Sequence, residues 1–397
     1  MNLTRLSMTA SPLLTALSLS LALAAQAGTA PASSGKNLDS AVAPKEQSAF
    51  DKIWALPVLY KNNENPFLEE FALTGRAQFD YFNVDSDKGD NDFFEIRRMR
   101  FGFDSYCADR FIQVKATMET NLRSFNADEV FYNRFTDLFI GLHFSDALNV
   151  RAGKLEPRFG YDRSMSDTLH KFFERTAFDD QVFNPGTDYE PGVNVFGKIG
   201  NWGYLLGVYS DQSDKEFGDF NGGSSYLAEI SYDFSKALQA EKAVWALDYM
   251  HMDNNVNSNV FVSMQNAAAT YFDYQKGKFG FATQFGYGNG IDSKGDIYSF
   301  MLMPTYYLTK KLELVARYQL MLASEDNGIT TLNRQEKTVG KFTGDTYNAV
   351  YVGLNYYLYG QKLKLMAGAQ YADLSAGTGA SAGYKGWTSL VGLRLFF

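Results

Sequence analysis

The chain has 397 residues, a formal net charge of −8 and one cysteine, Cys107. The acidic charge argues against nucleic acid as a partner, and a single cysteine excludes an internal disulfide framework. After residue 27, no stretch approaches the roughly 18 consecutive apolar residues of a transmembrane helix. Aromatic residues make up 16% of the chain, with 34 glycines against 9 prolines, and this mixture suits many short strands joined by tight turns.

Residues 1–27 have the pattern of a secretory signal peptide. Arg5 supplies a positive charge, residues 13–24 form an apolar core, and Ala25 to Ala27 fits a cleavage site. The apolar core is too short for a membrane anchor. We therefore expect export and removal of this segment.

Residues 28–68 form a polar lead-in that ends in a more apolar stretch with Trp54 and Tyr60. We expect this segment to lie in the periplasm, flexible at first and then docked near the domain that follows. The two aromatic rings suit the interface between membrane and water.

Residues 69–397 alternate between apolar and polar side chains, with the period of two that marks β-strands. In residues 111–121, for example, Ile112 and Val114 face one way while Gln113 and Lys115 face the other. Sixteen segments show this alternation: 71–81, 93–105, 111–121, 134–145, 147–155, 191–200, 201–210, 222–235, 242–252, 259–275, 277–289, 296–308, 310–322, 345–359, 361–373 and 384–397.

The connections between these segments alternate in length. Odd-numbered connections are long and polar, and the third, at about 156–190, is the longest; most even-numbered ones are tight turns such as Gly200-Asn201. This is typical of outer-membrane barrels, in which the turns are periplasmic and the loops are external. A soluble sandwich does not explain this parity. We therefore predict an all-β protein, a transmembrane antiparallel β-barrel of about 16 strands in the lipid of the bacterial outer membrane.

The last eleven residues, 387–397, place Trp387, Val391 and Leu395 on one face of a strand that finishes at Phe397. A C-terminal strand that finishes in phenylalanine is similar to the assembly signal of bacterial outer-membrane barrels. We expect the assembly machinery to recognise Phe397, and we expect the last strand to close against the first.

Three stretches resemble the phosphate-selective porin O and P family. Residues 95–102 resemble its arginine-rich second strand, and residues 152–160 resemble the run that enters its third external loop. Residues 173–175, followed by 191–193 and 201–204, fit the segment after that loop. The likeness extends loosely over residues 70–397, and it implies a sixteen-stranded porin that favours anions and is usually a homotrimer.

The strand faces opposite the apolar ones are expected to line a lumen. The inward bases that we expect to contact anions are Arg76, Arg98, Arg100, Lys115, Arg151, Arg317 and Arg394. Most of them lie on the first three and the last four strands, which become neighbours when the barrel closes, so they would form one basic wall. Alternatively, such charges keep a watery lumen solvated and pair with one another.

The third external loop carries charges of both signs and is expected to fold inward and narrow the pore. Arginines opposite loop carboxylates would then set the selectivity. The candidate constriction residues are Arg158, Arg163, Lys171, Glu174, Arg175, Asp179 and Asp180.

We therefore predict a porin for passive diffusion of small hydrophilic solutes, with a preference for anions such as phosphate. Because the third loop is acidic, a sugar porin or a weakly cation-selective porin stays open. A structural or adhesive barrel without an open pore is a further alternative.

Neither catalysis nor a bound metal is expected. Serine, histidine and aspartate residues are too scattered to indicate a catalytic triad. The acidic run at 85–92 lacks the glycine and glutamate positions of a calcium-binding loop, and we expect it to be a solvated surface loop. No cofactor is expected.

Overall fold

The computed structural model describes residues 48–121, 131–184, 189–212, 216–217, 220–253, 257–261, 264–291, 294–331, 333–375, 377–379 and 381–397. The chain divides after Ile53 into two units, and a short helix, α2 (Ala49–Ala55), begins in the first of them. The second unit, Trp54–Phe397, holds the strands. The expected signal peptide, 1–27, and the first part of the lead-in lie outside the described residues.

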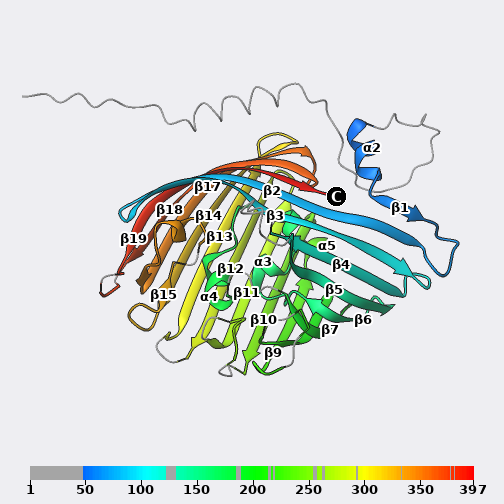
Figure 1. Cartoon of the computed structure of the whole chain (residues 1–397), viewed down its shortest axis with the longest axis horizontal. Helices are drawn as coiled ribbons and strands as arrows, with labels where there is room; N and C mark the ends of the chain where they lie inside the picture. The colour runs from blue at the N-terminus through cyan, green and yellow to red at the C-terminus, as the bar shows by residue number, and fades with distance from the viewer. Residues whose placement is uncertain are drawn as a thin grey trace, which may run out of the picture. The chain divides into compact units, whose positions relative to one another are not determined.

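Strands form the second unit (Figure 1). One continuous sheet has 17 strands. One of them, β1 (Val58–Lys61), is short and pairs with β2 outside the ring, and the other sixteen close a barrel. The ring consists of β2 (Glu70–Ser86), β3 (Gly89–Cys107), β4 (Ile112–Thr120), β5 (Tyr132–Ser145), β6 (Leu148–Leu155), β7 (Glu190–Ile199), β8 (Trp202–Ser210), β9 (Ser224–Asp233), β10 (Lys242–Met252), β11 (Met264–Lys276), β12 (Phe279–Gly290), β13 (Ile297–Tyr307), β14 (Leu312–Ala323), β17 (Thr346–Tyr359), β18 (Leu363–Ser375) and β19 (Tyr384–Phe396).

The predicted barrel of sixteen antiparallel strands is confirmed, and each predicted segment overlaps one of these strands. Between the strands lie α3 (Gly160–Arg163), η1 (Asp167–Leu169), α4 (Ala177–Val182), α5 (Ser235–Leu238), η2 (Glu336–Thr338) and a small hairpin of β15 (Ile329–Thr330) and β16 (Thr343–Gly344). Within the described ranges, no helix is long and apolar enough to cross a membrane.

One connection differs from the expectation. The acidic run at 85–92, expected as a surface loop, mostly continues the first two strands, with Ser86 paired to Gly89 across a turn of two residues. Gly89 has a φ of +133°, which glycine adopts readily because it has no Cβ. The strand ladder therefore extends past the point at which the apolar alternation stops, because the backbone hydrogen bonds do not depend on the side chains.

The barrel closes where the last strand meets the first. β19 pairs with β2 from Phe396 opposite Arg76 to Gly386 opposite Ser86. Beyond this ladder, the backbones of Phe397 and Gly75 exchange two hydrogen bonds of 2.9 and 3.0 Å. A Cβ on Gly75 would lie 2.1 Å from the ring of Phe397, so the glycine leaves the space that the terminal ring fills.

β1 continues the edge that β19 leaves open. It pairs with β2 at Val58–Ala72 and Lys61–Glu70, immediately beyond the seam. The Trp54 indole donates to the carbonyl oxygen of Phe396 over 2.6 Å. Residues 54–61 thus cover the end of the seam and satisfy backbone groups that the last strand does not reach.

The Gly75 pocket for the terminal ring gives a testable prediction. Gly75→Val overfills the space beside Phe397, and we expect a loss of about 1–3 kcal/mol of unfolding free energy, the usual effect of overpacking. Urea unfolding of the refolded barrel measures it. Ala237→Val, at an exposed residue of the turn between β9 and β10, is the control for a substitution with no contact at the seam. An unchanged unfolding midpoint for Gly75→Val would contradict the assigned packing of Phe397.

Candidate functional site

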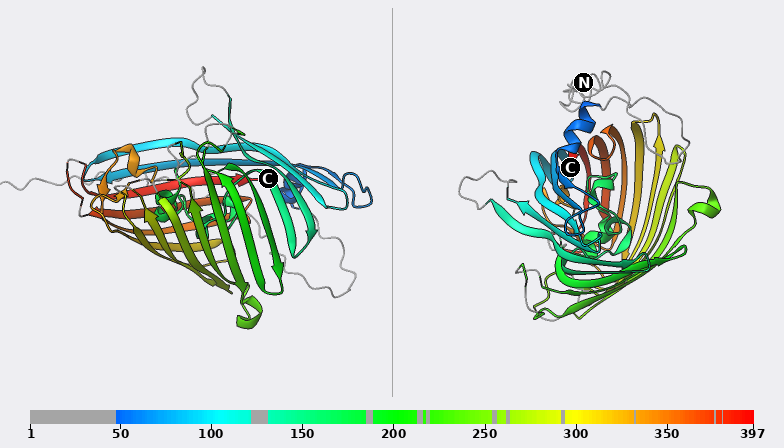
Figure 2. Two further views of the ribbon diagram at one scale, coloured as in Figure 1. Left: turned by 90° about the horizontal axis from the view of Figure 1, so that it is seen from below. Right: turned by 90° about the vertical axis from the view of Figure 1, so that its right-hand side faces the viewer.

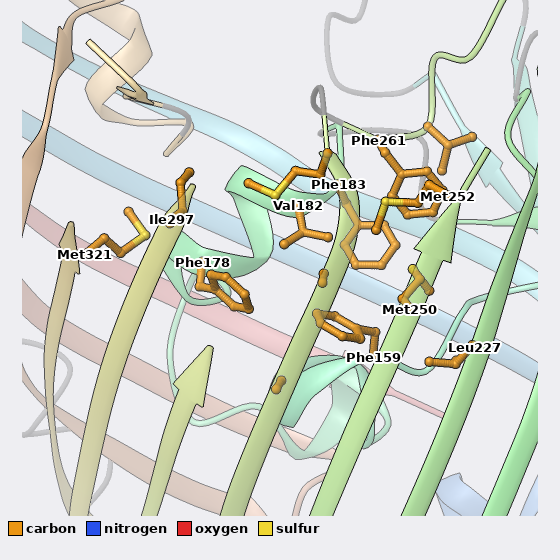
Figure 3. Packing of buried hydrophobic residues seen from close by; sticks show 14 of the residues in the cluster. Phe159, Phe178, Val182, Phe183, Leu227, Met250, Met252, Phe261, Ile297 and Met321 are labelled. Atoms are coloured by element: carbon orange, nitrogen blue, oxygen red, sulfur yellow. The ribbon is translucent and has the colours of Figure 1, made fainter. Parts of the chain in front are cut away.

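The connection between β6 and β7, residues 156–189, lies inside the ring of strands (Figure 2, right view, green). We call it the first inserted loop; it is described except for residues 185–188. Phe159, Phe178, Val182 and Phe183 on this loop are buried. They pack with inner-wall side chains such as Met250 in one apolar cluster (Figure 3). Because each buried phenylalanine contributes about 1.5–3 kcal/mol, apolar packing holds the loop against the wall.

Much of the inner wall under this loop is itself apolar. On β10 to β14 the buried, inward side chains include Met250, Ala267, Met301 and Val315, while outward neighbours such as Leu302 are exposed. The predicted inward faces rest on the assumption that the apolar face of each strand is the lipid side. This assumption fails on these strands, because the loop excludes water from the lumen side. This part of the barrel interior resembles the core of a soluble protein.

The opposite part of the wall carries the basic residues. Arg76 and Arg100 are cross-strand partners on β2 and β3, and both contact Asp167 of the first inserted loop. Arg100 also donates to Glu119 over 2.7 Å and to the Tyr189 hydroxyl over 3.0 Å.

Arg394 on β19 and Arg98 on β3 lie on either side of β2. The structure thus brings together four of the seven predicted wall residues, Arg76, Arg98, Arg100 and Arg394. Arg394 forms an ion pair with Asp80. Among the described residues, the Arg98 guanidinium has a single long hydrogen bond, 3.4 Å to Gln78.

A β-bulge adds one basic residue that alternation places on the wrong face. The register between β2 and β3 shifts at Gln78, so Arg97 and Arg98 are not on opposite faces as two consecutive strand residues would be. Arg97 is buried and donates to Glu174 over 3.2 Å. The sequence does contain a signal for the inward position of Arg97: an arginine that faces lipid costs about 2–4 kcal/mol at the bilayer centre.

The other predicted wall residues lie apart from this cluster. Lys115 pairs with Asp137 over 3.3 Å. Arg151 lies between the rings of Phe139 and Phe196, and its guanidinium carbon is 4.6 Å from the centre of the Phe196 ring.

Arg317 is covered by the first inserted loop. It donates to the backbone carbonyl of Glu174 over 2.9 Å, and its guanidinium lies over the Phe172 ring.

Several charged side chains of the first inserted loop pair with one another. Arg163 holds both oxygens of Asp179, at 2.5 and 3.0 Å, and Arg175 contacts Glu156 at 2.5 Å and Asp167 at 3.3 Å. These pairs fix the loop conformation and leave few of its charges free for a solute.

The remaining loop candidates connect the loop to the wall or stand alone. Lys171 pairs with Glu313 on β14 over 2.6 Å. Arg158 faces the Phe196 ring and has no carboxylate within 4 Å among the described residues. Burial and the adjacent Asp179 raise the pKa of Asp180 well above its usual range.

The loop carboxylates that face the basic wall are ionised. Burial opposes the ionisation of Asp167, but Arg76 and Arg175 outweigh it and hold its pKa well below the usual range. Burial likewise opposes ionisation of Glu174, and Arg97 lowers its pKa. The constriction is therefore a dense array of paired charges, with Arg98 and Arg151 as cations on its walls.

A second connection also enters the lumen, which sequence reasoning missed. Residues 324–345, between β14 and β17, form the second inserted loop, described except for residue 332. Gln181 of the first inserted loop donates to the carbonyl of Thr330 over 2.8 Å. Glu336 is buried against Tyr347 and Gln370, with hydrogen bonds of 3.1 and 3.4 Å. The polar, glycine-containing sequence of the second inserted loop does not distinguish it from an external loop.

Comparison with known proteins identifies the family of the chain. The family model for phosphate-selective porin O and P matches residues 71–279. No curated protein matches the chain.

Solved structures share the barrel at low identity. An anion-selective porin from Comamonas acidovorans is 12% identical, with a TM-score of 0.58 over 82% of this chain and 99% of that one. Pseudomonas putida OprB is 10% identical, with a TM-score of 0.60 over 88% and 96%. Salmonella typhi OmpF, solved in complex with daunomycin, is 9% identical, with a TM-score of 0.58 over 83% and 98%. At these identities the likeness concerns the fold.

The apolar attachment of the first inserted loop is testable. Phe178→Asp places a charge in the apolar cluster, which is strongly unfavourable, so we expect α4 to leave the wall and single-channel conductance to rise. Phe217→Asp, at an exposed residue between β8 and β9, introduces the same charge outside the apolar cluster and should leave conductance unchanged. A folded Phe178→Asp barrel with the conductance of the unmodified protein would show that this contact does not hold the constriction.

Docking of the second inserted loop should depend on pH. Burial raises the pKa of Glu336 to about 7 from 4.5, against the hydrogen bonds of Tyr347 and Gln370 and the charge of Arg317. A raised acid pKa stabilises the docked loop fully below about pH 4.5, and this contribution, about 3 kcal/mol, is lost as pH rises to about 7.

We therefore expect conductance to increase between about pH 5 and pH 8 in planar bilayers. Glu336→Gln keeps the shape without the ionisation and should flatten the profile. Glu325→Gln, exposed on the same loop, should keep the slope. An equal slope in both variants would assign the pH effect to other groups.

Proposed function

Because the chain belongs to the phosphate-selective porin O and P family, we propose that its pore favours small anions such as phosphate and that Arg98 contacts them in the constriction. The chain is a porin of the bacterial outer membrane, through which small hydrophilic solutes diffuse passively. Its family is one of channels rather than enzymes.

The observation that supports the anion preference is a set of inward arginines that have no carboxylate partner. Four inward arginines have no carboxylate within 4 Å in the described part of the chain: Arg98, Arg151, Arg158 and Arg317. A guanidinium stays charged at any working pH and offers a fork of donors that matches two phosphate oxygens. Arg98, Arg151 and Arg158 are partly exposed and can attract anions without displacing a carboxylate, whereas Arg317 is buried under the first inserted loop.

Inward carboxylates without a cation also exist, namely Asp104, Glu229 and Asp248. Gln113 donates to Asp104 over 2.9 Å, and the Gly160 backbone donates to Asp248 over 2.7 Å. A buried carboxyl group can also take up a proton and lose its charge, which a guanidinium does not do. These acids therefore reduce the preference to a modest one without reversing it.

The passage of an anion follows from this arrangement. The solute enters at the loop end of the barrel, the end from which the two inserted loops emerge. It then meets the guanidinium of Arg98 beside the first inserted loop, and it also passes Arg151 on β6 and Arg158 at the start of that loop. Because the attractive groups are several and separate, the anion moves between weak sites and is not trapped at one strong site.

The partners and processing of the chain belong to the same proposal. Outward side chains such as Leu206, Leu247 and Val352 are exposed, which suits lipid around a barrel or the neighbours in a homotrimer. We assign recognition by the assembly machinery to Phe397, export to residues 1–27, and a periplasmic location to residues 28–68.

Reversal potentials in a potassium chloride gradient test the role of Arg98. A unit charge about 7 Å from a permeating ion is worth about 2 kcal/mol at an effective dielectric constant near 20, and salt screening reduces this. We expect Arg98→Gln to lower the anion-to-cation permeability ratio by roughly threefold to tenfold. Lys236→Gln, the same change in an exposed turn, should have no effect.

An Arg98→Gln reversal potential equal to that of the unmodified protein would make this arginine an ordinary wall charge. Liposome swelling addresses the alternative of a closed structural barrel, because such a barrel would pass neither salt nor sugar.

A further inference from the structure

The second inserted loop carries an arginine that joins three separate parts of the chain. Arg334 Nη1 lies 2.6 Å from an oxygen of Glu95 on β3. Its Nε lies 3.3 Å from an oxygen of Glu174 on the first inserted loop. The wall, the first inserted loop and the second inserted loop therefore meet at one side chain, on the loop-end side of Arg98.

Glu174 is shared between the wall and the second inserted loop. One carboxylate oxygen accepts from Arg97 over 3.2 Å, and the other accepts from Gln335 over 3.0 Å as well as facing Arg334. The group consists of two acids, Glu95 and Glu174, and two arginines, Arg97 and Arg334. Its charge is balanced only while both arginines are present.

Exposure separates the members of this group. The Arg334 side chain is 25% exposed, against 8% for Glu95 and 13% for Glu174. The arginine is thus the member that faces water, and the two carboxylates lie behind it. A solute that approaches from the loop end meets a positive charge at this point.

We propose that Arg334 is a selectivity-determining residue of the pore: it screens Glu95 and Glu174 from entering solutes and presents a cation ahead of Arg98. The role deepens the anion preference proposed above and rests on it. Without Arg334, two carboxylates face one arginine, and the mouth of the constriction becomes net negative. Anions would be repelled before they reach the basic wall.

Charge-changing variants distinguish this role from a purely structural one. In a potassium chloride gradient, Arg334→Gln should lower the anion-to-cation permeability ratio by roughly threefold to tenfold, the range expected for one half-buried charge. Lys341→Gln makes the same change at an exposed residue of the same loop and should have little effect. Arg334→Lys keeps the charge and should keep most of the preference.

The double variant Arg334→Gln with Glu95→Gln is the decisive arm. It restores the charge balance of the group but leaves the connection between β3 and the loop broken. Return of the permeability ratio toward that of the unmodified protein supports the electrostatic role. A ratio as low as in Arg334→Gln alone overturns it and makes Arg334 a structural tie.

Charge can also be changed after folding, which avoids variants that fail to assemble. In a Cys107→Ser background, Arg334→Cys is reacted in the bilayer with methanethiosulfonates that carry an ammonium or a sulfonate group. The ammonium reagent should raise the permeability ratio and the sulfonate reagent should lower it; equal effects of the two would refute the proposal. If the proposed anion preference is itself wrong, the reversal potential of the unmodified protein will have the sign of a cation-selective pore, which is a separate result from the effect of Arg334.

Discussion

The hydrocarbon interior of a bilayer offers no hydrogen-bond partner to an unpaired strand edge, and the pairing of β19 with β2 meets this constraint. The functional wall depends on the same pairing. Arg76 and Arg394 come from opposite ends of the sequence, and they lie near Arg98 only because the edge strands close on each other. The chain thus assembles its most basic surface and its membrane-compatible backbone in one step.

The interior has two chemically different halves, and each holds the first inserted loop in its own way. Side chains such as Met301 and Val315 pack with the apolar side chains of the loops or lie beneath them, and this packing is indifferent to salt. Asp167 and Glu174 attach the other side of the loop to arginines, whose contribution depends on how far water and salt reach them. A loop fixed by both kinds of contact is a permanent part of the pore rather than a lid.

The sequence allowed prediction of the strand number, the antiparallel order and the inward side of Arg98, Arg100 and Arg394, because alternation reports on a single face at a time. It did not place Arg97 on the inner side, because one extra residue in a bulge changes the phase of the alternation without any mark in composition. The sequence did not indicate that Arg334 of the second inserted loop contacts Glu95, since tertiary packing decides which polar loops turn inward. On β10 to β14 many inward side chains are apolar as well, and at those positions periodicity cannot distinguish the face toward lipid from the face toward the loop.

The seam also determines how the chain must reach its folded state. It joins positions 76 and 396, which are 320 residues apart, and bringing such distant segments together costs about 5 kcal/mol in loop-closure entropy. Hairpins between consecutive strands form with far less loss of freedom, so they precede the seam in folding. Until β19 pairs with β2, the sheet carries two open edges, which are sites of aggregation. Once the ring is complete, separation of β19 from β2 must break a whole ladder at once, so the closed barrel is protected by a slow unfolding rate as well as by its equilibrium stability.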